Sequence, residues 1–250
     1  MAAVVRGVAG GRREAATGFE VAFLDPEEGE VRRRLEEVTQ VAFEEASPVR
    51  AFPSYRGQRS SPGFYYAATM QAHVGFESWL ERDEVMALDF DPDVIGFAAQ
   101  PFWLFWPDTN RVRSHAPDFF VRHRDGTGVI VDCRPQERIK PRDEAAFAAT
   151  KRACAEVGWQ FRLVHGHDPM WRANVRWLAG YRHLRFRIEP VSSRLLEAFA
   201  QPRPLIDGVQ SVGEPIAVLP ALYHLLWSRE LRTDLGSRLE ASSLVARSRP

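Results

Sequence analysis

The alternation of apolar and turn-forming residues predicts a β-hairpin within residues 115–135. FFVRH and GVIVDC are rich in Phe, Val and Ile, as strands are, and the RDGTG between them supplies glycines for a tight reversal. An antiparallel hairpin brings Asp118, at the head of the first strand, and Asp132, near the end of the second, towards one end. Two adjacent carboxylates repel, so one holds a proton unless a cation lies between them. Two solvated aspartates at strand ends are the simpler alternative.

Helical spacing predicts further elements on both sides of this hairpin. Helices are expected at 31–46, 73–91, 143–158 and 168–182, with two strands inside 91–107 and one at 159–166. The Gly-rich, Arg-rich start, residues 1–18, is expected to be disordered, and the Pro, Gly and Ser content of 47–64 indicates a loop. This order predicts an α/β (α+β) protein, with a mixed sheet flanked by helices.

The C-terminal residues predict a smaller unit of a different kind. SSRLLEAFA and PIAVLPALYHLLWSREL read as helices, and LRTDLGSRLEASSLV reads as a strand pair around Gly236. Helices that end in a hairpin outline a winged helix, although a helical extension packed on the main domain is the alternative. The expected division is an N-terminal arm with a short helix (1–63), a main domain (64–188) and a winged-helix-like unit that contacts DNA or partners (189–250).

Charge is balanced overall but is unevenly distributed along the chain. The 250 residues carry 33 Lys and Arg against 33 Asp and Glu, so no global basic field indicates a nucleic-acid partner. Residues 77–93 contain seven acids and one base, Arg82, whereas 151–190 contain eight bases and three acids. This separation suits a protein that binds cations in one place and phosphates in another. Two oppositely charged solvated faces are an equally simple interpretation.

Cysteine content and hydropathy indicate a cytoplasmic protein. The cysteines, Cys133 and Cys154, have no CxxC spacing, which argues against a disulfide framework or a zinc ribbon. The first residues lack the apolar run of a signal peptide. No segment approaches the roughly 20 apolar residues of a membrane span. We therefore expect no membrane contact.

Three acids and one base form the candidate chemistry. Carboxylate oxygens are the ligands that Mg²⁺, and also Mn²⁺, prefers, and such an ion activates water for attack on a phosphodiester. Asp118 and Asp132 would hold this ion together with Glu81 or Glu77, which lie one helical turn apart on the expected helix. Arg134 would share the face of Asp132, because side chains alternate along a strand.

The layout Glu…Pro-Asp…Asp-x-Arg resembles the PD-(D/E)xK nuclease signature, with arginine in place of lysine. FESWLERD, DFDPDVIGFAAQP, HAPDFFV and VIVDCRP, in this order, resemble the TnsA-like endonuclease subunit of heteromeric transposases, in the form common in actinobacteria. The tail YHLLWSRELRTDLGSRLEASSLV resembles the C-terminal segment of the same family. The resemblance extends over residues 64–245.

This resemblance implies a restriction-endonuclease-like fold and a set of site residues. The family's helix glutamate falls on Glu81, with Glu77 as the alternative, and its metal-bridging aspartate falls on Asp118. The second strand acid falls on Asp132 and the basic residue on Arg134. The implied activity is Mg²⁺-dependent cleavage of one DNA strand, on the 5′ side, at transposon ends. The implied partners are DNA, an RNase H-like transposase and an AAA+ ATPase regulator.

Several features leave alternatives open. Arginine cannot lose its proton near neutral pH, so Arg134 can stabilise charge but cannot act as a base. The chain is therefore either an active enzyme or a catalytically weakened scaffold subunit, and a stand-alone restriction or repair nuclease is a further alternative. Gln100 either lines the site or caps a strand, and His115 either touches a phosphate or makes a structural hydrogen bond.

Overall fold

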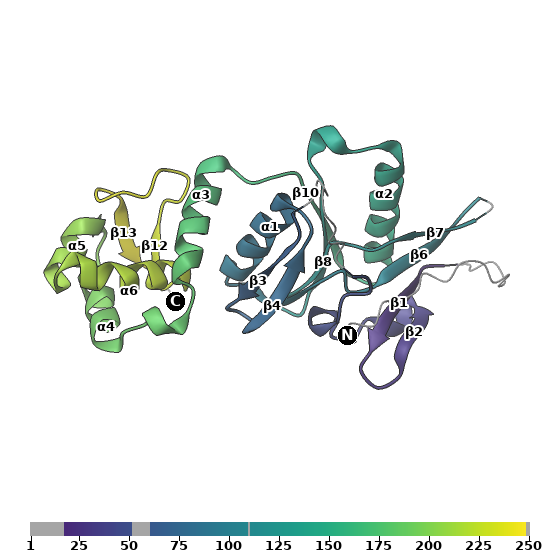
Figure 1. The fold of residues 1–250 in the computed structure, drawn as a ribbon, viewed down its shortest axis with the longest axis horizontal. Coiled ribbons are helices and arrows are strands. Elements are labelled where there is room, and N and C mark those ends of the chain that lie inside the picture. The colour runs from purple at the N-terminus through teal and green to yellow at the C-terminus, as the bar shows by residue number, and fades with distance from the viewer. Residues whose placement is uncertain (1–17, 52–60, 110, 249–250) are drawn as a thin grey trace. The chain divides into compact units, whose positions relative to one another are not determined.

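The computed structural model describes residues 18–51, 61–109 and 111–248, and they form two compact units. The first unit contains residues up to 85 together with 93–166. The second contains residues 86–92 and 167–250. Helix α1 (Trp79–Phe90) supplies its first residues to one unit and its last residues to the other (Figure 1).

A mixed four-stranded sheet forms the centre of the first unit. Its order is β10-β9-β8-β5, and its strands are β5 (Val94–Ala99), β8 (Phe119–His123), β9 (Gly128–Cys133) and β10 (Gln160–Val164). The predicted hairpin is confirmed, since β8 and β9 pair antiparallel with Phe119 opposite Val131. Helix α2 (Pro141–Glu156) then returns the chain to β10, which lies parallel to β9. The predicted mixed sheet is therefore also confirmed.

A second, antiparallel sheet has the order β2-β1-β6-β7. Its strands are β1 (Glu20–Asp25), β2 (Gly29–Arg34), β6 (Trp103–Asp108) and β7 (Arg111–His115). Phe43 joins the two sheets, because its ring lies 4.8 Å from that of Phe102, just before β6, and 5.7 Å from that of Phe120 on β8. A separate ribbon pairs β3 (Gly63–Ala67) with β4 (Ala72–Phe76).

Some predicted elements in this unit are wrong. Residues 31–46 form β2 and two 3-10 turns, Leu35–Val38 and Phe43–Glu45, rather than a helix, because β2 pairs with β1. The helix expected at 73–91 begins at Trp79, and β4 precedes it. Strand β7 was not predicted, and β3 begins inside the expected loop 47–64. Residues 1–17 and 52–60 of the expected disordered start and loop lie outside the described residues.

The second unit has the connectivity of a winged helix. Its elements in chain order are α3 (Pro169–Leu178), α4 (Glu189–Ala198), β11 (Arg203–Pro204), α5 (Leu205–Val212), α6 (Pro215–Trp227), β12 (Leu231–Thr233) and β13 (Leu244–Arg247). The three short strands pair antiparallel in the order β11-β13-β12. The predicted C-terminal helices and strand pair are present, and the structure adds α5 and β11.

The compact units do not divide at the residues expected from composition. Helix α3 lies in the second unit, where Val175 and Leu178 share a core with Leu222 and Trp227, so the division falls after Gly166 rather than after residue 188. Strands β1 and β2, from the expected N-terminal arm, belong to the antiparallel sheet of the first unit. Among the described residues, no helix combines the length and the apolar character needed to cross a membrane.

Candidate active site

The open end of the β8–β9 hairpin places two aspartates against each other's main chain. Asp118 directly precedes β8 and Asp132 lies in β9. The amide of Asp118 donates to Asp132 Oδ1 at 3.2 Å, and the amide of Cys133 donates to Asp118 Oδ2 at 2.7 Å. The predicted convergence of the two carboxylates therefore occurs, and hydrogen bonds to main-chain amides fix both of them.

Glu81 is held at the start of helix α1 by its own capping interactions. Ser78 Oγ accepts a hydrogen bond from the Glu81 amide at 3.2 Å and donates to Glu81 Oε1 at 2.7 Å. Glu81 Oε2 accepts from the Glu77 amide at 2.6 Å. This arrangement resembles a capping box, in which the third residue of a helix reaches back to the residues before it. It keeps the buried Glu81 carboxylate in one orientation.

The three carboxylates share one electrostatic environment. Burial and the negative charges of Asp132 and Glu81 raise the pKa of Asp118 well above its usual range, against the opposing effects of the Cys133 amide and Arg134. Burial also raises the pKa of Glu81, and the charge of Glu77 adds to the increase. Asp132 itself is only 2% exposed. The structure thus brings Glu81, Asp118 and Asp132 together into a cluster that favours a neutralising cation.

Arg134 lies next to this cluster and is exposed. Its main chain is fixed on both sides, since its amide donates to the Val164 carbonyl at 2.9 Å and its own carbonyl accepts from His165 Nδ1 at 2.8 Å. Its positive charge lies close enough to Asp118 to oppose the rise in the pKa of that carboxyl, which burial dominates. An arginine so placed can meet an anion at the cluster.

His115 makes the structural hydrogen bond that was one of its two predicted roles. It ends strand β7, and its Nε2 lies 2.9 Å from both Oδ1 and Oδ2 of Asp132. Its ring makes an edge-to-face contact with that of Phe147 on α2, with centroids 6.1 Å apart. His115 is therefore a direct partner of a site carboxylate.

Gln100 lies opposite Asp118 where β5 ends. Its amide donates to the Asp118 carbonyl, and its carbonyl accepts from the Val49 amide, both at 2.9 Å. Its φ of 48° lies in the left-handed region, which is unusual for a residue with a side chain. Gln100 is 1% exposed, and within the described part of the chain its buried Oε1 has no hydrogen-bond partner. A strained backbone and a buried orphaned oxygen, at a residue whose main chain is hydrogen-bonded to Asp118, are outliers of the kind that gather at functional sites.

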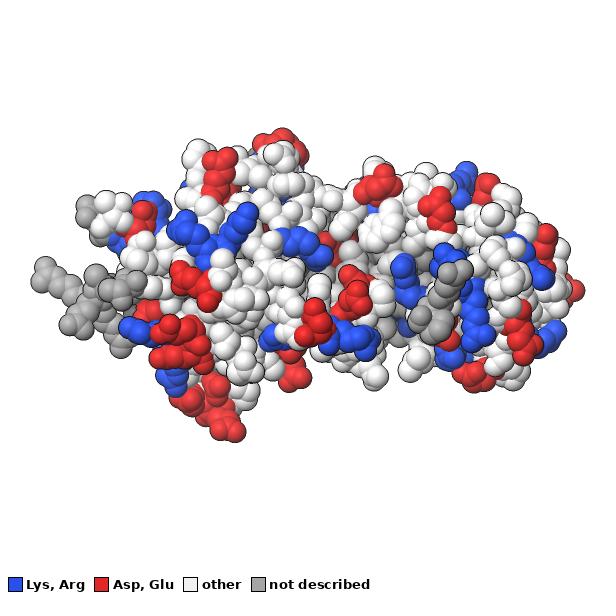
Figure 2. All heavy atoms as spheres, turned by 180° about the vertical axis from the view of Figure 1, so that it is seen from behind, with Lys and Arg blue, Asp and Glu red and all other residues white. Residues whose placement is uncertain are grey.

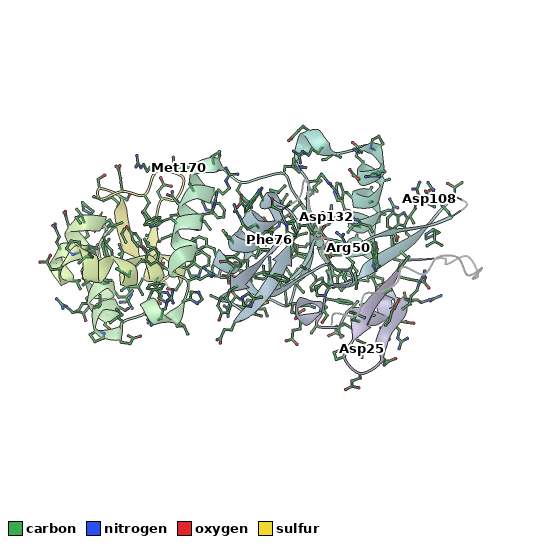
Figure 3. The ribbon with its side chains drawn as sticks, in the orientation of Figure 1. Asp25, Arg50, Phe76, Asp108, Asp132 and Met170 are labelled. Carbon is green, nitrogen blue, oxygen red and sulfur yellow. The ribbon has the colours of Figure 1, made fainter. Side chains whose placement is uncertain are left out.

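Glu77 does not lie on the helix, so its expected position one helical turn before Glu81 is wrong. It lies between β4 and α1, and its Oε2 accepts from Arg50 at 2.8 Å. Sequence reasoning missed Arg50, because this contact bridges 27 residues from within a Pro-rich and Ser-rich segment. Figure 3 labels Arg50 and Asp132 in the body of the first unit, whereas Asp25 and Asp108 lie at the tips of two hairpins.

The two cysteines contribute no nucleophile to this site. Both are free and buried. Burial raises the pKa of Cys154 to about 12 and raises that of Cys133, which neighbours the carboxylates, well above its ordinary value. Both thiols therefore stay protonated at neutral pH, and the chemistry depends on the carboxylates.

The donor set matches a hard divalent cation in the chemical type of its atoms. Among the described residues, no three His, Cys, Asp or Glu side chains are already arranged around a common metal position. The strand carboxylates instead accept hydrogen bonds from main-chain amides and from His115. However, three clustered carboxylates and an orphaned amide oxygen are all oxygen donors, which are the type that Mg²⁺ prefers. The residues thus match Mg²⁺ in kind.

Part of the chain matches a known family. Residues 91–166 match the family model described as the TnsA-like endonuclease N-terminal domain. This segment contains β5 to β10 and, with them, Asp118, Asp132 and Arg134, whereas Glu81 lies before it. No curated protein sequence is significantly similar to the chain.

Proposed function

Because residues 91–166 match the family model of the TnsA-like endonuclease N-terminal domain, we propose that the chain is a Mg²⁺-dependent endonuclease that cleaves one DNA strand, on the 5′ side, at transposon ends. The observation that supports this proposal most strongly is the carboxylate cluster. The charges of Asp132 and Glu81 act together with burial to raise the pKa of Asp118, and Arg134 lies beside them. An isolated acidic cluster of this kind is costly unless a cation or proton neutralises it.

The residues have separate roles in this reaction. Asp118, Asp132 and Glu81 would hold the ion, with the hydrogen bonds to Asp118 and Asp132 fixing the carboxylates before it arrives. When bound, Mg²⁺ supplies an activated water and neutralises charge on the leaving oxygen. Arg134 would hold the attacked phosphate and offset its growing charge, a role that suits a group that stays protonated. Gln100 would present its free Oε1 to water or to the substrate.

The proposed partners follow from the same domain. A TnsA-like subunit would act on DNA together with an RNase H-like transposase, which would cut and join the other strand, and with an AAA+ ATPase regulator.

One observation favours a second candidate, a catalytically weakened scaffold subunit of the same complex. Both strand carboxylates already have hydrogen-bond donors within the protein. His115 Nε2 lies within hydrogen-bond distance of both oxygens of Asp132. If His115 keeps both oxygens of Asp132 when DNA is bound, Asp132 does not ligate an ion.

Cleavage of end-labelled DNA tests the proposal against this alternative. The duplex carries the transposon end, and the reaction contains Mg²⁺ or Mn²⁺, with and without the proposed RNase H-like transposase. The proposal expects metal-dependent nicking by the wild type and none by Asp118→Asn. If the wild type is inert beside an active transposase, the scaffold function replaces the enzymatic one.

A further inference from the structure

Helix α6 occupies the position of the DNA-reading helix in a winged helix, directly before the strand hairpin. Its sequence, PIAVLPALYHLLW, contains no Lys or Arg, and Leu222, Leu225 and Trp227 are buried in the core of the unit. Its most exposed large side chain is Ile216, at 89%. The helix therefore offers no Lys or Arg to phosphates, and of its polar side chains His224 is buried and Tyr223 is partly buried against Tyr181.

Another part of the same unit gathers positive charge. The end of α4 and the small sheet enclose a hollow of about 870 Å³, whose lining includes Arg229, Arg232 and Arg247 together with Gln201 and Pro202. Arg232 lies on β12 and Arg247 at the end of β13, on neighbouring strands. On the side of the molecule shown in Figure 2, Lys and Arg side chains gather over part of this unit.

The charge of these arginines is not cancelled within the unit. In the described part of the chain, Arg229, Arg232 and Arg247 form no ion pair with a carboxylate. The acid that lines the hollow, Glu230, is bound by Arg187, and its Oε1 also accepts from Ser228 Oγ at 3.0 Å. The hollow is therefore a positively charged concavity whose three arginines make no ion pair among the described residues.

Arg229 occupies a position where glycine is usual. It follows the C-cap of α6, Ser228, with a φ of 63°, in the left-handed conformation that most often ends a helix with glycine. Its guanidinium lies over the ring of Phe90 at 4.7 Å from the centroid. A long side chain in a strained conformation is the kind of outlier that points to a function for that side chain.

We propose that this arginine-lined hollow binds the phosphate backbone of DNA, so that the second unit holds DNA through its sheet rather than through α6. Guanidinium groups match phosphate geometry and carry no sequence preference, so the contact positions the duplex without reading it. The polyanion is the substrate that the proposed nuclease activity requires, and to that extent the inference rests on the proposed function. Binding itself needs neither metal nor cleavage.

Equilibrium binding to a fluorescein-labelled duplex of arbitrary sequence, over a range of salt concentrations, tests this site. All proteins are full-length and carry Asp118→Asn to suppress cleavage. Two variants are compared with this background. The single variant carries Arg232→Gln, and the triple variant carries Arg229→Gly, Arg232→Gln and Arg247→Gln. The matched control is Arg194→Gln, an exposed arginine on α4 outside the hollow. Arg229→Gly restores the residue that suits the backbone conformation, so the melting temperature is expected to stay unchanged or to rise.

Each lost phosphate contact should reduce the slope of log K against log salt by about 0.9. We expect this slope to fall by about one for Arg232→Gln and by about two to three for the triple variant. The triple variant should also lose at least tenfold in affinity, and Arg194→Gln should show no change.

Unchanged slope and affinity in the folded single and triple variants would overturn the proposal. Retained DNA binding with loss of binding to an acidic partner protein would overturn it in favour of a protein-docking site. If the wild-type chain does not cleave DNA but the variants show the expected salt slopes, the proposed nuclease activity is wrong and the proposed phosphate-binding site still stands.

Discussion

Asp118 and Asp132 are tied together through the main chain of the hairpin that carries them. The Asp118 amide donates to Asp132 Oδ1 at 3.2 Å, and the residue after Asp132 returns a hydrogen bond to Asp118 Oδ2 at 2.7 Å. Two like charges are thus held close together by the backbone of a rigid sheet. The site is preorganised, and the repulsion between its acids is stored until a cation or a proton relieves it.

We expect Asp118→Asn to stabilise the metal-free protein above acidic pH. A carboxyl whose pKa is raised on folding holds its proton more tightly in the folded state, so stability falls as pH rises from its ordinary pKa of 3.8 to its folded-state pKa. Asn keeps an oxygen for the Cys133 amide but has no charge. Each pKa unit removed is worth about 1.4 kcal/mol. Urea unfolding in EDTA should show an advantage for the variant that is absent below about pH 4 and grows above it.

Asp125→Asn is the control, and we expect its effect on the free energy of unfolding to depend on pH in the opposite direction. Asp125 lies exposed in the β8–β9 turn, and a hydrogen bond from the Thr127 amide lowers its pKa. Its contribution to stability is therefore present at neutral pH and is lost on acidification. If Asp118→Asn and Asp125→Asn showed the same dependence on pH, the proposed repulsion at Asp118 would be wrong.

Removal of His115 should destabilise the metal-free protein. Within the described residues, the hydrogen bond that the buried Asp132 carboxylate would keep is the long one from the Asp118 amide, and an undersatisfied buried acceptor costs about 1–3 kcal/mol. His115→Ala should therefore lower the free energy of unfolding by this amount, and His115→Gln, which retains a donor, should recover part of it. His123→Ala on β8 is the matched control. Equal losses for His115→Ala and His123→Ala would show that the contact with Asp132 contributes nothing.

Arg134→Ala should lower DNA cleavage by on the order of 10²–10³-fold, the usual effect of losing one group that stabilises transition-state charge. DNA affinity should change little, because the second unit supplies separate contacts. Arg134→Lys should retain substantial activity, since the signature it resembles carries lysine there. Arg138→Ala, in the 3-10 turn that follows, is the control. Cleavage by Arg134→Ala at the wild-type rate would move this role to another cation, with Arg50, Lys140 and Lys151 the next to replace.

The position of the unit boundary predicts how truncations behave. A chain that ends at residue 189 keeps helix α3 but removes the partners of Val175 and Leu178. A chain that ends at Gly166 removes the exposed helix as well. We expect the longer fragment to bind more of the dye ANS and to aggregate more readily, because it exposes more apolar surface. If the fragment ending at residue 189 bound less ANS and aggregated less than the shorter one, α3 would belong with the first unit instead.

Sequence patterns predict the structure best where the local preference of a segment for helix or strand is the same as the structure it adopts in the fold. The β8–β9 hairpin follows from strand alternation and turn glycines. Helices α2 and α3 follow from helical spacing, and tertiary packing does not oppose these elements. Hairpin geometry alone therefore placed Asp118 and Asp132 together. Glu81 was assigned from the resemblance, and its capping interactions with Ser78 show why that position is fixed.

Elsewhere, tertiary pairing decided the structure. The charged segment 31–46 fits a helix as well as a strand, and the pairing of β2 with β1 selects the strand. Phe76 fits an apolar helical face, yet it pairs with Gly63 in a ribbon whose first strand emerges from a loop-like sequence. The contact of Arg50 with Glu77 and the backbone conformation of Gln100 depend on distant segments, so no local pattern could indicate them.

Calorimetric titration with Mn²⁺ tests the central claim most directly, because it needs no DNA, partner or catalytic turnover. We expect saturable binding to the wild-type chain, a large loss of affinity in both Asp118→Asn and Asp132→Asn, and unchanged binding in Asp125→Asn. Binding should also release protons at pH values where the metal-free Asp118 carboxyl still holds its proton, because burial and its neighbouring acids raise the pKa of Asp118 well above its usual range. Absence of binding at millimolar Mn²⁺, or equal binding by the wild type and both site variants, would contradict the assignment of these carboxylates as a metal centre.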